Sequence, residues 1–182
     1  MFEKKALYLI YNLCIATSCK GRETHRETYK LGDHIFTLPP TGEEEMYIAQ
    51  IDGIFKDRDG EWIDCIWLER AKDMKVLVNA REWNQTRSNL LPGEVFLCTT
   101  VNANPIQCIE GHVEILTLEK YEVGRKAMGK GTESIGFMKN KFVCRQALID
   151  AGRKVGGSLT PVVFDPGRGF VVPQNKGKGK HR

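Results

Sequence analysis

Alternating apolar and polar positions between residues 46 and 70 predict a β-hairpin. Two runs rich in β-branched and aromatic residues flank the turn sequence Lys-Asp-Arg-Asp-Gly at 56–60, and an Asp-Gly pair between such runs is a strong hairpin signal. Successive side chains of a strand point to opposite faces. Trp67 and Glu69 therefore share a face of the second strand, and with Tyr47 on the first strand they are candidates to point into one recess.

Two aromatic rings beside a carboxylate can hold an alkylated ammonium group through cation–π and Coulomb attraction. The alternative is that both rings belong to the core, since aromatic side chains are large contributors to cores. Glu69 also has an alternative, that of an exposed strand residue paired with Arg70 or Lys72, an interaction of little energetic consequence. The pattern leaves these alternatives open.

The rest of the chain reads as short strands joined by irregular segments rich in glycine, proline and polar residues. Further strands are expected at 29–38 with a break at Gly32-Asp33, and at 93–100, 105–109, 112–118 and 141–145. Other segments are expected as a strand or short helix (1–18), a loop or exposed hairpin (18–28), a turn and strand (71–79), an irregular connection (80–92), a turn (102–105) and one helical turn (117–124). This pattern predicts a mainly β, barrel-like fold with long irregular loops and little helix.

The positive charge is concentrated at the end of the chain. The sequence has 27 Lys and Arg against 23 Asp and Glu, and four of the cations are Lys176, Lys178, Lys180 and Arg182. The rest of the chain is neutral, so a globally basic nucleic-acid-binding domain is not indicated. The glycine-spaced tail cannot bury a core, and we expect it to contact DNA weakly and without sequence preference.

The cysteines and the remaining motifs argue against several classes of protein. Six cysteines form no Cys-x-x-Cys pair, which favours free thiols in a reducing compartment over a disulfide framework or a zinc site. The apolar run at 7–16 is too short to span a membrane. No nucleophile–base spacing, phosphate-binding loop or metal cluster is visible, so we expect neither an enzyme nor a cofactor.

Four sequence blocks stand out in order along the chain. They are Tyr29-Lys-Leu-Gly-Asp-His-Ile-Phe; Tyr47-Ile-Ala-Gln-Ile with Trp67-Leu-Glu-Arg70; Gly93-Glu-Val-Phe-Leu-Cys continuing to Asn104-Pro-Ile-Gln-Cys-Ile-Glu-Gly-His-Val; and Lys141-Phe-Val-Cys-Arg. Together, over roughly residues 28–150, they resemble the motifs of the bromo-adjacent homology (BAH) domain family.

This resemblance implies a distorted β-barrel and a non-enzymatic, nuclear chromatin module. The expected organisation is an N-terminal extension (1–27), a BAH domain (28–155), a C-terminal extension on or near the body (156–173) and a basic disordered tail (174–182). Some members of the family read methylated lysine on histone tails, some bind nucleosomes, and others bind further chromatin proteins. Neither a membrane nor a small-molecule substrate is implied.

The resemblance also assigns candidate residues to a binding site. Methyl-lysine readers of the family use an aromatic cage, and Tyr47 and Trp67 match its first two positions while Glu69 stands at the third. Thr100 and Asn102 stand near positions where tail-reading members tend to carry His and Asp. Trp83, in the segment expected to be irregular, is either a plug over the core or a further ring in contact with the ligand.

Two functions remain open at this stage. The first is a histone-tail reader with an incomplete aromatic cage, in which the carboxylate favours lower methylation states because it can accept a hydrogen bond from an ammonium N–H. The second is an interaction module of a silencing or remodelling complex that binds protein or nucleosome without methyl-lysine recognition.

Overall fold

The computed structural model describes residues 8–9, 12–17, 25–39, 45–127, 141–149 and 156–173. Strands make up more than half of these residues, which confirms the mainly β class. The strands are β1 (Tyr8–Leu9), β2 (Asn12–Thr17), β3 (His25–Lys30), β4 (His34–Thr37), β5 (Tyr47–Lys56), β6 (Glu61–Arg70), β7 (Glu94–Pro105), β8 (Ile109–His112), β9 (Glu114–Leu116), β10 (Lys141–Ile149), β11 (Ser158–Pro161), β12 (Val163–Asp165) and β13 (Gly169–Val171). The helices are α1 (Ala71–Leu77), α2 (Ala80–Thr86) and α3 (Leu118–Ala127), with 3₁₀ turns η1 (Arg87–Asn89) and η2 (Ile106–Cys108).

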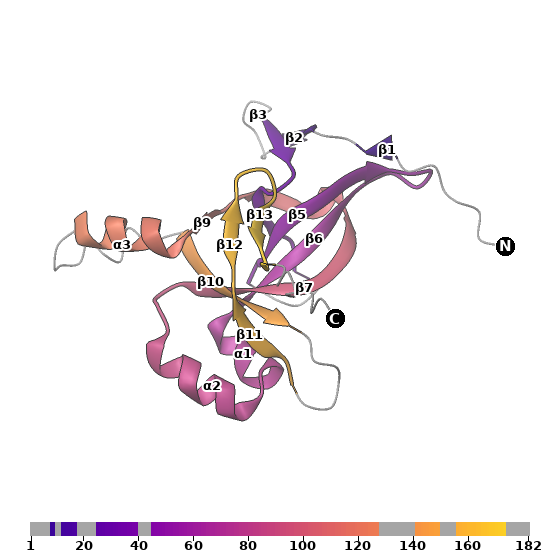
Figure 1. Cartoon of the computed structure of the whole chain (residues 1–182). Helices are drawn as coiled ribbons and strands as arrows, with labels where there is room; N and C mark the ends of the chain where they lie inside the picture. The colour runs from indigo at the N-terminus through magenta and orange to yellow at the C-terminus, as the bar shows by residue number, and fades with distance from the viewer. Residues whose placement is uncertain are drawn as a thin grey trace, which may run out of the picture.

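Nine of the described strands form one sheet with the central order β11-β10-β7-β6-β5-β4-β8, to which β1 and β9 add at β5 and β10. The long antiparallel strands β5, β6 and β7 run through its middle (Figure 1). In contrast, β10 pairs in parallel with both β7 and β9. The hairpins β2–β3 and β12–β13 form separate two-stranded sheets.

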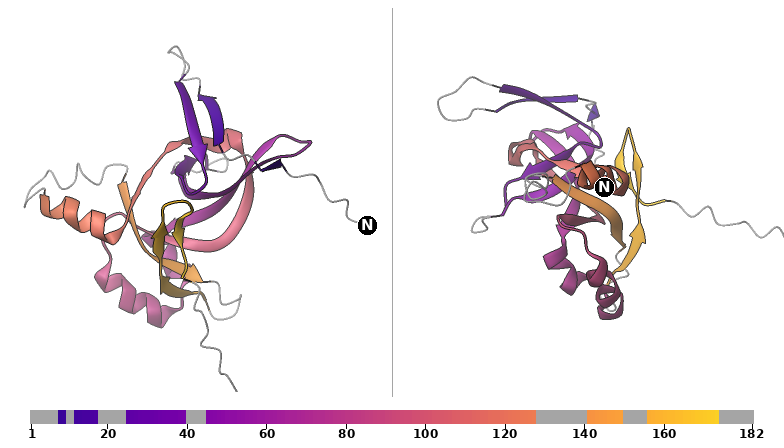
Figure 2. Two further views of the ribbon diagram at one scale, coloured as in Figure 1. Left: turned by 45° about the horizontal axis from the view of Figure 1, so that its top comes forward. Right: turned by 90° about the vertical axis from the view of Figure 1, so that its left-hand side faces the viewer.

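The barrel-like sheet is open, because the described strands do not close into a ring. The strand order ends at β8 on one side and at β11 on the other. The chain instead passes from β8 through Val113 into β9, and β9 pairs with β10. A covalent connection therefore bridges the two sides of the sheet, which curves around the core (Figure 2).

Helix is more extensive than the sequence analysis predicted. α1 replaces the turn and strand expected at 71–79, α2 and η1 replace the irregular connection at 80–92, and α3 extends the single turn expected at 117–124. The start of α2 follows ordinary capping chemistry. The side-chain oxygen of Asn79 accepts a hydrogen bond from the backbone N–H of Glu82 at 3.0 Å, which satisfies a donor that the first helical turn leaves unpaired.

The hairpin predicted between residues 46 and 70 is confirmed, with Ala49 of β5 opposite Trp67 of β6. The break at Gly32-Asp33 is confirmed as well, since it separates β3 from β4. The turn predicted at 102–105 is wrong, because those residues continue β7 and pair with the first half of β6. The strand expected next, at 105–109, is mostly the 3₁₀ turn η2.

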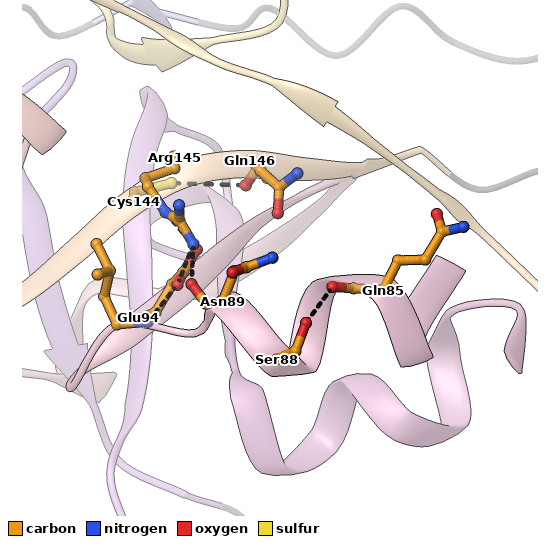
Figure 3. A network of polar contacts seen from close by, with 8 residues as sticks. Gln85, Ser88, Asn89, Glu94, Cys144, Arg145 and Gln146 are labelled. Carbon is orange, nitrogen blue, oxygen red and sulfur yellow. Dashed lines mark hydrogen bonds and ion pairs between the residues drawn. The ribbon is translucent and has the colours of Figure 1, made fainter. Parts of the chain in front are cut away.

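A buried ion pair joins two of the sequence blocks that lie far apart in the chain (Figure 3). Arg145 of β10 donates to both carboxylate oxygens of Glu94 at the start of β7, at 2.9 and 2.7 Å. The Glu94 side chain is 0% exposed. Arg145 also donates to the carbonyl of Asn89 at 3.0 Å, and Glu94 accepts from the N–H of Leu91 at 2.8 Å. The pair therefore ties β10, β7 and the end of η1 together.

The C-terminal hairpin β12–β13 lies along one side of the sheet, beside β10 in the right-hand view of Figure 2, and completes the core there. Phe170 is buried and belongs to the cluster of Ile48, Leu68 and Val95. The buried side chain of Gln50 on β5 holds the backbone of the hairpin. Its oxygen accepts from the N–H of Phe170 at 2.6 Å, and its nitrogen donates to the carbonyls of Arg168 and Phe170. These contacts hold the hairpin against the body of the domain.

Candidate functional site

A recess with a volume of about 770 Å³ opens where β5, β6 and α1 meet. Its lining includes all three residues proposed from the sequence, Tyr47, Trp67 and Glu69. β6 runs directly into α1 at Arg70, so the helix forms a wall of the recess next to the strand that carries the indole. The remaining lining residues are Glu45, Ile48, Leu68, Arg70, Lys72, Asp73, Val76 and Leu77.

The two aromatic rings of the recess meet edge to face. The centroids of the Tyr47 and Trp67 rings are 5.9 Å apart, with 80° between the ring planes. The cross-strand pairing explains this arrangement, because Trp67 stands opposite Ala49 and Tyr47 is its diagonal neighbour on the same strand face. Both side chains are half-buried. Two perpendicular ring faces that reach solvent form two sides of a site for a cation.

The orientation of the Trp67 ring is set from the neighbouring strand. The β6–β7 pairing shifts register between Ile66 and Leu68, so Trp67 lies at a bulge, a feature that changes the direction of a side chain. The indole Nε1 donates a hydrogen bond to the side-chain oxygen of Asn102 at 3.0 Å. The Trp67 side chain also packs against two clusters of the core. Trp67 therefore combines a fixed ring with an accessible face.

Glu69 brings a partly desolvated carboxylate to the recess. Burial raises the pKa of Glu69, the charge of Asp73 raises it further, and Arg70 acts in the opposite direction. Among the described residues no cation lies within ion-pair distance of Glu69. The alternative in which it pairs with Arg70 or Lys72 is not what the structure shows, because Glu45 binds both of those cations.

Glu45 lines the recess together with Arg70 at the end of β6 and Lys72 in α1. Its carboxylate contacts Arg70 Nε at 2.9 Å and also binds the ammonium of Lys72. The hydrogen bond from Lys72 and the charge of Arg70 lower the pKa of Glu45. A second nitrogen of Arg70 donates to the carbonyl of Met46 at 2.9 Å. The two cations that line the recess are thus partly neutralised by Glu45.

Comparison with known protein families identifies the same family that the four sequence blocks resemble. The BAH domain family matches residues 27–154. The chain belongs to the BAH domain family. BAH domains are chromatin-associated, non-catalytic modules. Among solved structures, the chain is similar to the yeast Rsc2 BAH domain, with 15% sequence identity and a TM-score of 0.47 over 75% of this chain and 53% of that one. The chain therefore spans about half the length of that structure. No curated protein sequence matches it.

The BAH blocks contact one another in the folded chain. The third and fourth blocks meet in the ion pair of Glu94 and Arg145. The second and fourth meet where the guanidinium of Arg70 lies over the Phe142 ring, 5.9 Å from its centroid. In the first block, the N–H of Gly32 donates to the carbonyl of Ile51 at 2.8 Å. These contacts give the motif residues structural roles that are separate from ligand binding.

The other residues proposed from the sequence lie in different parts of the domain. Trp83 is 9% exposed and packs edge to face on Phe96, 6.5 Å between centroids, so it belongs to the core and does not line the recess. Thr100 is exposed at the bulged part of β7, and Asn102 contacts the Trp67 indole rather than standing free. The tail candidates Lys176, Lys178, Lys180 and Arg182 lie outside the described residues.

Sequence reasoning missed the contribution of α1 to this BAH domain. Asp73, Val76 and Leu77 line the recess, but the segment was expected to form a turn and strand. The available signal was the run of helix-forming residues after Arg70.

Within the part of the chain that the structure describes, no group of His, Cys, Asp or Glu side chains could hold a metal ion. No described helix is long and apolar enough to cross a membrane. Four cysteines, Cys65, Cys98, Cys108 and Cys144, are free thiols, and burial is the main cause that raises the pKa of each of them.

Proposed function

We propose that this BAH domain is a nuclear histone-tail reader that holds a methylated lysine between Tyr47 and Trp67, with Glu69 as the third side of the site. The observation that carries the proposal is the convergence of these three side chains, from two strands, on one recess. Each correctly placed ring contributes about 0.5–2 kcal/mol to the binding of a cation.

The carboxylates determine which cation suits the recess. A monomethyl or dimethyl ammonium group still carries an N–H, which can donate to Glu69, whereas a trimethyl group has no proton to donate. Glu69 is partly buried and has Asp73 beside it. A cationic ligand would relieve the repulsion between these two carboxylates. The proposal therefore favours the lower methylation states over the trimethyl state.

The neighbourhood of the recess favours a basic ligand. Lys72 would repel a lysine-rich tail, but its ammonium is bound by Glu45, as is the guanidinium of Arg70. The basic C-terminal tail lies outside the described residues, and we propose for Lys176, Lys178, Lys180 and Arg182 a weak, non-specific contact with nucleosomal DNA. Such contacts position a protein on chromatin without adding sequence specificity.

The test is isothermal titration of the chain with unmodified, monomethyl, dimethyl and trimethyl lysine peptides from histone tails. Wild-type protein should bind the monomethyl and dimethyl forms most tightly, and Trp67→Ala should abolish the preference while the protein stays folded by circular dichroism. Trp62→Ala is the matched control, because Trp62 is a half-buried indole of the same strand that hydrogen-bonds Asp57 at the hairpin turn, away from the recess.

If wild-type protein binds no methylated peptide more tightly than the unmodified one, methyl-lysine recognition is wrong. The domain would then be the second candidate, an interaction module that binds a protein or a nucleosome without regard to methylation. In that case Trp67→Ala should leave nucleosome binding unchanged.

A further inference from the structure

The recess has an apolar side in addition to its rings and carboxylates. Val76 and Leu77, in the last turn of α1, line it and are exposed by 83% and 37%. Both come from α1, whereas the residues that would contact a methylated ammonium come from β5 and β6. Exposed aliphatic side chains that border a polar recess are typical of interaction surfaces.

These two aliphatic side chains are not needed to hold α1 in place. The helix is anchored by Met74, which is fully buried, and by Val78 directly after the helix, both in the core cluster that contains Trp83. Neither Val76 nor Leu77 belongs to a core cluster of the described residues. Folding therefore leaves their apolar surface available for contact with a ligand.

The volume of the recess also indicates that it can hold more than one lysine side chain. Its volume of about 770 Å³ lies within the range of about 300–1,000 Å³ that is typical of sites for ligands of drug size. One lysine side chain between the rings leaves much of this space unfilled. The space that remains is bordered in part by α1, because Val76 and Leu77 line the same recess as Tyr47 and Trp67.

We propose that Val76 and Leu77 form a second subsite, which binds an aliphatic side chain of the same peptide whose lysine enters between Tyr47 and Trp67. This inference rests on the proposed function and adds the sequence context of the lysine. The ligand is then a basic peptide with an aliphatic residue close to the lysine. The cation complements the carboxylates of Glu69 and Asp73, and the aliphatic residue covers apolar surface that is otherwise in water.

The experiment uses synthetic peptides of glycine and serine centred on one dimethyl-lysine, with leucine placed in turn at each flanking position. Binding is measured by fluorescence polarisation. At one position leucine should tighten binding about five- to tenfold, the size expected from burying part of one aliphatic side chain. Val76→Ser and the double substitution Val76→Ser/Leu77→Ser should remove this gain, measured in each variant as the ratio of its affinities for the leucine and the leucine-free peptides.

Val123→Ser is the matched control, because Val123 is an exposed valine of α3, 63% exposed, that does not line the recess. It should keep the full gain from leucine. The inference is wrong if no leucine position tightens binding or if the gain persists in the Val76 and Leu77 variants. The proposed function fails separately, if the leucine-free dimethyl-lysine peptide binds no better than its unmodified counterpart.

Discussion

The Trp67 indole is hydrogen-bonded through Nε1 to the side-chain oxygen of Asn102, although the two residues are 35 positions apart in the sequence. β7 thereby fixes the orientation of a ring that β6 carries. A ring held in one orientation before the ligand arrives does not lose that freedom on binding, and such preorganisation improves affinity.

Asn102→Ala should therefore weaken binding of dimethyl-lysine peptide by about fivefold, which corresponds to about 1 kcal/mol for one hydrogen bond. Asn102→Asp keeps an acceptor for the indole N–H and should retain most of the affinity. Both variants should melt within a few degrees of wild type, because Asn102 is exposed. Equal affinity of Asn102→Ala and wild type would show that the hydrogen bond does not preorganise the site.

Glu69→Tyr should shift the methylation preference towards the trimethyl state. The change replaces a hydrogen-bond acceptor and a negative charge with a third aromatic face, which is worth about 0.5–2 kcal/mol to a cation that has no N–H. Titration with the series of methylated peptides measures the ratio of trimethyl to monomethyl affinity. Glu69→Gln, which removes the charge and keeps a carbonyl acceptor, separates the two effects. An unchanged ratio in Glu69→Tyr would remove Glu69 from the site.

The recess was only partly predictable from the sequence. Alternation was enough to place Trp67 and Glu69 on one face of β6. That Tyr47 lies on the same side depends on a bulge in β5, where the register shifts between Ile51 and Gly53, and the sequence did not predict this shift. The contribution of α1 was not predictable in the same way, since seven residues are too few for a clear helical period. Its wall of Asp73 and Val76 depends on how Met74 packs in the core.

Trp83 is another residue whose role could not be determined from the sequence. In the sequence it stood in a stretch read as irregular, where a plug over the core and a ligand-contacting ring were equally possible. In the structure α2 places the Trp83 ring against Phe96. Tertiary packing therefore determines that this ring belongs to the core. The open sheet also depends on distant pairing, because β10 joins β7 and β9 in parallel, and no local pattern specifies a parallel partner.

Arg145→Met should destabilise the domain by about 3–5 kcal/mol, because it leaves the carboxylate of Glu94 buried without its cation. The loss should appear as a lower midpoint in urea denaturation. Lys56→Met breaks the exposed pair with Glu61 and is the control, with an expected change below about 1 kcal/mol. Similar losses in both variants would mean that burial of Glu94 is not what makes the pair important.

The stability of the domain should fall as the pH decreases from about 6.5 to about 4. Burial of His34 lowers its pKa to about 4, while hydrogen bonding to Gln50 and the charge of Asp33 act in the opposite direction. In the unfolded chain His34 takes up a proton near pH 6.5, whereas in the folded domain it does so only near pH 4. The contribution of neutral His34 to the free energy of unfolding is therefore complete above pH 6.5 and is lost as the pH falls. The maximum loss is roughly 3 kcal/mol.

Urea denaturation at several pH values measures this loss, and a His34→Gln variant provides the comparison because it cannot titrate. The difference between the two proteins should change between pH 6.5 and 4 and be constant above that range. Burial raises the pKa of Glu69 and Asp64, so these carboxyls act in the opposite sense in both proteins. A constant difference at all pH values would contradict the assignment to His34.

Removal of residues 156–182 should strongly destabilise the domain, although the family match ends at residue 154. The truncation takes away Phe170 and leaves the Gln50 side chain without the backbone groups it binds. We expect a melting temperature lower by many degrees. Deletion of 174–182 alone should leave the melting temperature nearly unchanged and weaken nucleosome binding at low salt. Equal melting of both truncations would show that the hairpin is dispensable.

The contact between Gln50 and Phe170 also sets the order in which the chain can finish folding. Gln50 is synthesised 120 residues before Phe170. Until the hairpin arrives, the buried Gln50 amide can bond to His34 but lacks the backbone groups of Arg168 and Phe170 that it binds in the complete domain. The central strands can pair during this interval, but that side of the core stays open to water and to chaperones. Completion of the domain is therefore a late step, and it takes place only after nearly all of this chain has left the ribosome.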